Sequence, residues 1–180
     1  KDMDAIKKEY GRKRRTAIEN AEEAVYEEKK MEEMEVCFLM DRFGYMKLID
    51  KNAYERNKEA VHNENKYVFN CMNTDKICIF TDTGKMHTIK AVDIPLGRFR
   101  DKGTPVDNLS NYDSSQERML YVAPVGQLRS DRLLFVTKTS MCKLVEGAEF
   151  DVAKRTIAST KLADEDELIF IGSASEMEQI

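Results

Sequence analysis

The sequence has little of what membrane proteins and most enzymes need. Its 180 residues contain no run approaching the roughly 18 apolar residues of a membrane-spanning helix, so we expect a soluble, cytoplasmic protein with no membrane partner. There is no Walker lysine loop, no G-x-G-x-x-G, no zinc-ligand spacing and no nucleophile elbow. These absences predict a binding domain without a catalytic residue, metal site or cofactor of its own. The first residue is Lys1, which suggests a piece of a longer protein.

Histidine and cysteine are also scarce. The two histidines, His62 and His87, are isolated, and we expect both on the surface rather than as ligands or bases. The four cysteines form no C-x-x-C pair, and each lies in an apolar, strand-like run. Buried, reduced thiols are predicted at all four positions, which are Cys37, Cys71, Cys78 and Cys142.

Charge is plentiful but unevenly distributed. The net charge is −4, which by itself argues against a nucleic-acid partner. Most of the acidic excess lies at the two ends, since residues 1–35 contain 11 acids and 9 bases, and residues 161–180 contain 6 acids and 1 base. The chain between them carries 16 acids and 19 bases. A mildly basic body is therefore predicted between acidic flanks.

Three segments align on one another, and each is typical of a strand, a tight turn and a second strand. They cover residues 36–48, 77–88 and 133–144. Each turn carries Gly or Ser, at a place where a positive φ is needed in tight hairpins. A polar, basic loop and a further strand follow each hairpin, and these later strands are Tyr67–Met72, Met119–Ala123 and Leu168–Gly172.

This internal repeat decides the predicted fold. A unit of strand, turn, strand, basic loop and strand, spaced by roughly 40 to 55 residues, is typical of propeller-like blades. We therefore predict an all-β, propeller-like domain of four-stranded blades over residues 36–180, incomplete, with about three blades present. Residues 1–16 are predicted as a short helix end and a basic junction. Residues 17–35, rich in glutamate, are predicted as an acidic linker or edge strand, with a short helix as the alternative.

Several motifs, taken in order, resemble a known family. Gly44-Tyr45-Met46-Lys47 resembles the blade hairpin in the C-terminal domain of the gyrase A protein. Residues 80–87, continuing into Asp93-Ile94-Pro95, are similar to the second blade of that family, and residues 102–106 to the loop and strand after it. Residues 6–11 and 14–16 resemble the end of the gyrase A coiled coil and its exit. The resemblance covers essentially the whole chain and points to the bacterial type IIA topoisomerases, gyrase and topoisomerase IV.

The resemblance implies a fold, a function and partners. The fold is a β-pinwheel that binds and bends or wraps double-stranded DNA along its perimeter without sequence preference. The A subunit pairs with a topoisomerase B subunit in an A2B2 enzyme, an isomerase that uses ATP and Mg²⁺ through its other domains. The DNA-attacking tyrosine follows an arginine in the family, and this sequence contains no Arg-Tyr dipeptide. We therefore expect this chain to bind DNA but not to cleave it.

One departure bears on the kind of topoisomerase. Gyrase carries a box rich in Gly and Arg in the first blade, tied to chiral wrapping of DNA. The matching stretch here, residues 55–66, contains no glycine and only Arg56, Lys58 and Lys66 as bases. Glycine lets a backbone approach phosphates closely, and arginine supplies bidentate donors. A topoisomerase IV-like or weakly wrapping gyrase-like protein is therefore favoured.

The candidate DNA contacts are lysines and arginines on hairpins and loops, because phosphate binding is electrostatic and independent of sequence. The densest group lies in the loop from Gly97 to Gly103. The predicted DNA-binding residues are Lys47, Arg56, Lys58, Lys90, Arg98, Arg100, Lys102, Lys143, Lys154 and Arg155. The alternative function is a propeller-like protein-interaction module that does not bind DNA.

Overall fold

The computed structural model describes residues 2–12 and 32–177. The chain forms two units, Lys1–Glu32 and Glu33–Ile180. In the first, helix α1 (Asp2–Tyr10) ends in a turn containing Lys7 and Lys8, which complement the negative end of the helix dipole. The predicted features at residues 13–31, which include most of the basic junction and the acidic linker, lie outside the described residues.

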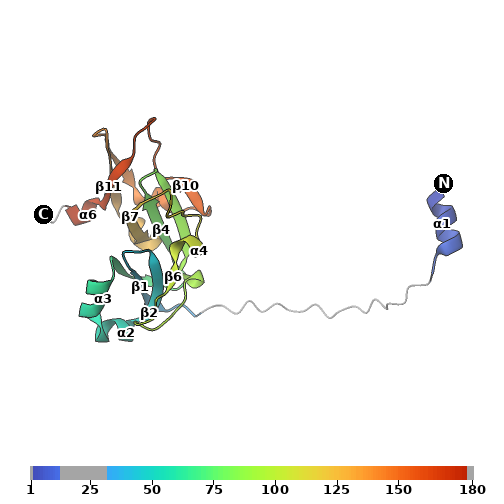
Figure 1. Ribbon diagram of the computed structural model, residues 1–180, viewed down its shortest axis with the longest axis horizontal. Coiled ribbons are helices and arrows are strands. Elements are labelled where there is room, and N and C mark those ends of the chain that lie inside the picture. Colours follow the sequence, from blue (N-terminus) through green and yellow to red (C-terminus); the bar gives the residue numbers. More distant parts are fainter. Residues whose placement is uncertain (1, 13–31, 178–180) are drawn as a thin grey trace. The chain divides into compact units, whose positions relative to one another are not determined.

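The second unit consists of three antiparallel sheets (Figure 1). The first sheet has the order β3-β1-β2-β6 and comprises β1 (Glu35–Met40), β2 (Tyr45–Asp50), β3 (Tyr67–Met72) and β6 (Thr104–Pro105). The second has the order β10-β5-β4-β7 and comprises β4 (Lys76–Thr81), β5 (Lys85–Lys90), β7 (Met119–Pro124) and β10 (Thr156–Ala158). The third has the order β11-β8-β9 and comprises β8 (Arg132–Thr137), β9 (Cys142–Glu146) and β11 (Leu168–Ser173).

Short helices connect these strands. Two of them, α2 (Lys51–Arg56) and α3 (Lys58–Glu64), lie beside β1 and β2 at one end of the stack of sheets (Figure 1). The others are the 3₁₀ turns η1 (Ala91–Asp93) and η2 (Gly147–Phe150) and the helices α4 (Val106–Leu109), α5 (Val125–Leu128) and α6 (Ala174–Met177).

All three predicted hairpins form, and their turns use the predicted residues. Gly44 has a φ of 81° and Gly84 a φ of 75° at the first two turns. Ser140 has a φ of 65° at the third. Positive φ costs a residue with a side chain more than it costs glycine, so the third turn forms against a local backbone preference.

The first two sheets each receive their fourth strand from the following repeat. Strand β6, which comes after the second hairpin, pairs with Tyr45 and Met46 of the first sheet. Strand β10, which comes after the third hairpin, pairs with residues 85–87 of the second sheet. The exchange covers a sheet edge and ties neighbouring blades together. We call the segments leading into these strands the first crossover (residues 97–103) and the second crossover (residues 151–155).

Most of the hydrophobic core lies in the two spaces between successive sheets. Alternate side chains of a strand point to opposite faces, so β4 contributes Ile77 and Ile79 to the space shared with the first sheet. Its Cys78 and Phe80 lie in the space shared with the third sheet. Fully burying a side chain such as Phe80 stabilises the fold by about 1.5–3 kcal/mol. The predicted partial β-pinwheel with a short N-terminal helix is confirmed.

The stretch predicted as the polar, basic loop of the first blade is instead helical. The carboxylate of Asp50 accepts a hydrogen bond from the Ala53 amide at 2.9 Å and caps α2. In α3, Val61 is completely buried against Cys37, Leu39 and Ile49 on the far face of the first sheet. The loop prediction was wrong because it relied on the charged residues of this stretch. It missed two signals of helical structure, which are the capping residue Asp50 and the buried apolar residue Val61.

Two predictions about rare residues also need correction. Cys37, Cys71 and Cys78 are buried as predicted, and burial raises the pKa of Cys37 to about 11. Cys142, in contrast, is exposed on β9. His62 is exposed as predicted, whereas His87 is only 1% exposed. Both errors come from which face of a strand the residue occupies, which depends on register.

Candidate nucleic-acid interface

The predicted DNA-binding residues lie on three kinds of element. Lys47, Lys90 and Lys143 are on strands β2, β5 and β9. Arg56 and Lys58 flank the junction of helices α2 and α3. The remaining residues lie on the crossovers, with Arg98, Arg100 and Lys102 on the first and Lys154 and Arg155 on the second.

The two crossover clusters occupy equivalent places in the repeat. Lys102 precedes β6 by two residues, and Arg155 directly precedes β10. In both cases the basic residues stand at the point where the chain passes from one blade to the edge of the preceding one. The fold therefore presents positive charge at the same place on successive blades, which a single loop read in isolation does not reveal.

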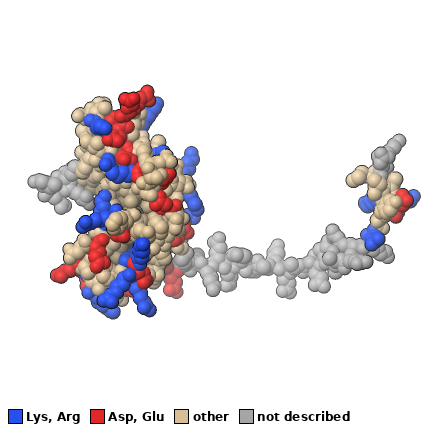
Figure 2. Space-filling view, viewed as in Figure 1, with Lys and Arg blue, Asp and Glu red and all other residues tan. Residues whose placement is uncertain are grey.

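Most of these residues carry charge that the described part of the chain does not neutralise. All of them except the half-buried Lys47 are exposed, and none forms an ion pair with a described carboxylate. Other bases are neutralised by described acids, and these are Lys51, Lys76, Lys85, Arg118, Arg129 and Lys138. Figure 2 shows basic and acidic side chains interspersed over the visible face rather than gathered in a single basic patch.

Lys47 is engaged within the protein. Its Nζ donates hydrogen bonds to the carbonyl oxygens of Phe99 at 2.5 Å and Asp101 at 2.6 Å. The same atom lies 5.5 Å from the centroid of the Phe99 ring. Bonds from a charged donor are stronger than neutral ones, so Lys47 fixes the first crossover on the face of the first blade.

His87 occupies the equivalent position in the second blade. Lys47 is opposite Leu39 in the first hairpin, and His87 is opposite Ile79 in the second. The Nδ1 atom of His87 is 3.1 Å from Thr156 Oγ1 of β10, and its Nε2 atom is 2.8 Å from Glu117 Oε2. The histidine therefore joins the exchanged strand to a buried carboxylate, and a sequence pattern of isolated histidines gave no sign of this contact.

Glu117 is held in its charged form despite being buried. Burial opposes ionisation, but hydrogen bonds from Lys85, at 2.8 Å, and from His87 outweigh it. The pKa of the Glu117 carboxyl consequently lies below its usual value. The second crossover strand is thus fastened by a buried polar group, whereas the first is fastened by a lysine on carbonyl oxygens.

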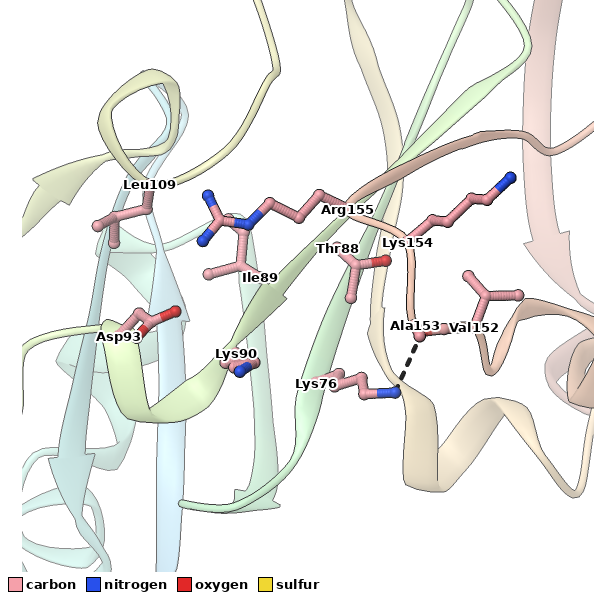
Figure 3. Close-up of a pocket in the computed structure, with 10 residues that line it drawn as sticks. All are labelled: Lys76, Thr88, Ile89, Lys90, Asp93, Leu109, Val152, Ala153, Lys154 and Arg155. Carbon is pink, nitrogen blue, oxygen red and sulfur yellow. Dashed lines mark hydrogen bonds between the residues drawn. The ribbon is translucent and has the colours of Figure 1, made fainter. Parts of the chain in front are cut away.

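The two crossovers differ in electrostatic surroundings. The groove beside the first is lined by three bases and three acids, which are Lys47, Arg100, Lys102, Asp41, Glu64 and Asp101. A cleft beside the second is lined by four bases and one acid, which are Lys76, Lys90, Lys154, Arg155 and Asp93 (Figure 3). The sequence favoured the first crossover on its number of bases, but the folded chain leaves the larger positive excess at the second.

Within the described residues, no helix is long and apolar enough to span a membrane. Among the same residues, no group of three or more His, Cys, Asp or Glu side chains is arranged to hold a metal ion.

Comparison with known sequences supports one family. The chain is 29% identical over 181 residues to the DNA gyrase A protein of Clostridium acetobutylicum, in an alignment that covers 94% of this chain and 22% of the relative. It is 28% identical over 182 residues to the DNA gyrase A protein of Streptococcus pneumoniae, covering 93% of this chain and 22% of that protein. The chain thus spans about a fifth of the length of these relatives. No protein-family model matches it.

Comparison with solved structures supports the fold. The crystal structure of the C-terminal domain of DNA topoisomerase IV matches with a TM-score of 0.68 at 17% identity, covering 79% of this chain and 46% of that domain. The C-terminal domain of Escherichia coli ParC matches with a TM-score of 0.58 at 10% identity, covering 77% of this chain and 56% of that domain. The family resemblance expected from the sequence is confirmed.

Proposed function

Because the chain is a homologue of the DNA gyrase A protein with the fold of type IIA topoisomerase C-terminal domains, we propose that its folded part binds duplex DNA without sequence preference and bends it. The contacts run through phosphates, which Lys and Arg neutralise with release of counterions. The chain contributes this binding to strand passage by the whole enzyme and does not cut DNA itself.

The observation that carries the proposal is the repeated placement of unneutralised bases at the crossovers. Arg98 and Arg100 on the first crossover and Lys154 and Arg155 on the second are exposed and make no ion pair with described residues. Since both groups precede exchanged strands, they recur with the period of the blades. DNA that follows successive blades meets positive charge at each step, which favours bending over contact at one point.

The rest of the enzyme supplies the chemistry. In the proposed cytoplasmic assembly, two copies of the A protein combine with two B subunits to form A2B2. ATP and Mg²⁺ act through domains other than this one, as does the tyrosine that attacks DNA.

The first test is salt dependence. The 180-residue chain is titrated with a labelled linear duplex at several salt concentrations. We expect weak binding at physiological salt and a linear fall of log K with log salt, with a slope of about −0.9 for each phosphate contacted. A protein-interaction module has no reason to show this dependence. An affinity for duplex that does not change with salt would contradict the proposal.

The second test compares two sets of substitutions with equal loss of charge. Changing Arg98, Arg100 and Lys102 together to Ala removes unpaired bases of the first crossover. We expect weaker binding to all duplexes alike and a salt slope reduced by up to about 3. The control changes Lys51, Arg118 and Lys138, which are exposed and ion-paired with described acids. Equal effects of the two sets would mean that net charge, not the crossover, governs binding.

The helices α2 and α3 of the first blade lead to a prediction of how the whole enzyme alters DNA topology. Residues 51–64 are folded into α2 and α3, so this stretch has no glycine-rich loop to fasten DNA, and Glu59 and Glu64 are both exposed. We expect the reconstituted A and B subunits to relax or decatenate DNA well and to introduce negative supercoils poorly. The assay uses relaxed plasmid and ATP, and efficient negative supercoiling would contradict the expectation.

A further inference from the structure

The tip of the first hairpin carries an apolar ring that makes little contact with the rest of the fold. Phe43 lies in the turn between β1 and β2 and is 85% exposed, more than any other large apolar residue in the described part of the chain. Its ring packs against no other aromatic ring of the described residues. Single exposed apolar residues are common on protein surfaces, so the case for a function rests on how this turn differs from its repeats.

The equivalent turns of the second and third hairpins have a threonine at this position. The hydroxyl oxygens of Thr83 and Thr139 lie 2.9 and 3.1 Å from the hydroxyl oxygen of a threonine two residues earlier. In the first hairpin Asp41 takes the place of that earlier threonine, and its Oδ1 accepts hydrogen bonds from the amides of Phe43 at 2.8 Å and Tyr45 at 3.0 Å. The turn is therefore closed by Asp41, and the hairpin does not need the ring of Phe43.

The base at this tip also differs from its equivalents in the other two turns. Asp82 of the second hairpin lies with its Oδ2 3.6 Å from Arg118 Nε, and Lys138 of the third has its Nζ 3.2 Å from Glu167 Oε1. Both are thus neutralised by a residue from another part of the chain. Arg42 is exposed and forms no ion pair with a described residue. Of the three turns, the first therefore combines an unneutralised guanidinium with an exposed aromatic ring.

Two further bases flank the tip. Lys102 of the first crossover has its Nζ 4.4 Å from the centroid of the Tyr45 ring. The amide of Lys66, directly before β3, donates to the carbonyl oxygen of Met40 at 2.8 Å. Both lysines are exposed and neither is ion-paired with a described residue. Because the neighbouring groove has as many acids as bases, charge alone gives a weak contact with DNA here, and an apolar contact would add to it.

We propose that Phe43 and Arg42 form a wedge that contacts duplex DNA from the minor groove, with the ring of Phe43 between two neighbouring base pairs and Arg42 on the adjacent backbone. Apolar side chains that enter between base pairs in this way partly unstack them and kink the duplex. The contact is independent of sequence, because every base has a face on which a ring can stack. This inference rests on the proposed function, and it assigns part of the bending to one residue of the first blade.

The first experiment places a fluorescent reporter at the tip. The chain contains no tryptophan, so Phe43→Trp introduces a single indole there. Its emission is followed while the 180-residue chain is saturated with a linear duplex, and we expect strong quenching because the indole stacks on a base. Thr139→Trp, at the equivalent turn position of the third hairpin, is the matched control and should keep its emission. Equal quenching of both indoles, or of neither, would contradict a wedge at the first tip.

The second experiment removes the ring without changing the charge. Phe43→Ala should weaken duplex binding about tenfold, the order expected for one stacked base, and should leave the salt slope unchanged. A duplex with a single mismatch is less costly to unstack, so the unsubstituted chain should prefer it over the intact duplex, and Phe43→Ala should lose this preference. Arg42→Met should instead reduce the salt slope by about 0.9.

The control for this experiment is Met141→Ala, which truncates another exposed apolar side chain, 65% exposed, beside the third turn. It should leave affinity, salt slope and mismatch preference unchanged, and urea unfolding confirms that each variant stays folded. If duplex binds with the expected salt dependence, but Phe43→Ala binds and discriminates like the unsubstituted chain, the wedge is refuted while the proposed function stands. If no duplex is bound at any salt concentration, the proposed function fails and the wedge fails with it.

Discussion

The two outermost blades of the structure differ in what covers their outer faces. On the first blade, α2 and α3 cover Cys37, Leu39 and Ile49, which are at most 1% exposed. On the third blade the corresponding face is open, and Leu144 and Phe170 are 48% and 45% exposed. Both faces are apolar, so the difference lies in whether a local segment of the chain provides a cover.

The same arrangement of strands thus occurs with a covered outer face in the first blade and an exposed outer face in the third. An exposed apolar face of this kind marks a contact surface, whereas a covered face is part of the core. Strand β9 of the third blade also pairs with β8 alone among the described strands, while the equivalent strands β2 and β5 each pair on both sides. On the first blade the helices α2 and α3 cover the outer face, whereas among the described residues the outer face and the β9 edge of the third blade have no such cover.

The largest effect is expected from a charge placed beneath the helical cover. Val61→Asp puts a carboxylate at a completely buried position without a partner, so we expect the free energy of unfolding to fall by about 3 kcal/mol or more. Urea denaturation of the 180-residue chain measures it.

The matched control is Leu144→Asp, on the open face of the third blade. It should cost far less than Val61→Asp, about 1 kcal/mol or less, because about half of Leu144 is already exposed to water. Equal losses in the two variants would show that the third-blade face is covered in solution, and the comparison of the two faces would not hold.

A smaller effect is expected at the buried carboxylate of the second blade. The pKa of Glu117 is lowered on folding, so its stabilising contribution is fully present above the usual pKa near 4.5 and is lost as pH falls through the lower folded-state value. Glu117→Gln removes charge-assisted bonds to Lys85 and His87, and should cost about 1–3 kcal/mol at pH 7.

The pH dependence distinguishes this contribution from ordinary packing. Urea unfolding is measured at pH 7 and at pH 3 for both proteins. The unsubstituted chain should lose more stability between these pH values than Glu117→Gln, since the variant has no carboxyl to protonate there. Parallel losses in the two proteins would mean that other carboxyl groups account for the acid sensitivity.

The fold was predictable because its signals are local and repeated. Each hairpin carries Gly or Ser at the turn, as at Gly44 and Ser140, and each is followed by a further strand rich in apolar residues. What the sequence did not reveal is the exchange of strands. β6 is two residues long and β10 three, and neither has a pattern that distinguishes it from a loop. Their place in a sheet depends on pairing with a distant hairpin.

The candidate interface was predictable only as a set of bases. Counting charges along the chain found Arg98 and Lys154, but the acids that neutralise some bases and not others come from distant segments. The roles of Lys47 and His87 also depend on partners more than 25 residues away in sequence, at Phe99 and Glu117. The charges in the sequence identify candidate DNA-binding residues, and the folded structure determines which of them remain free to bind phosphate.

The smallest expected effects separate the two lysines at equivalent positions of the first and third blades. Lys47 is opposite Leu39, and Lys143 is opposite Phe135 in the third hairpin. Lys47 donates to two carbonyl oxygens, whereas Lys143 is exposed and has no partner within the described residues. We therefore expect Lys47 to contribute to the stability of the fold and Lys143 to contribute to DNA binding.

Substitution by methionine tests this division, because it keeps most of the side-chain stem and removes the charge. Lys47→Met should lower the free energy of unfolding by about 1 kcal/mol. It should leave the salt slope of duplex binding unchanged. Lys143→Met should leave stability within about 0.5 kcal/mol and reduce the salt slope by about 0.9, the value for one phosphate. Urea unfolding and duplex titration at several salt concentrations measure both quantities. The opposite assignment of effects would show that the hydrogen bonds of Lys47 yield to DNA and that the open third blade does not take part in the interface.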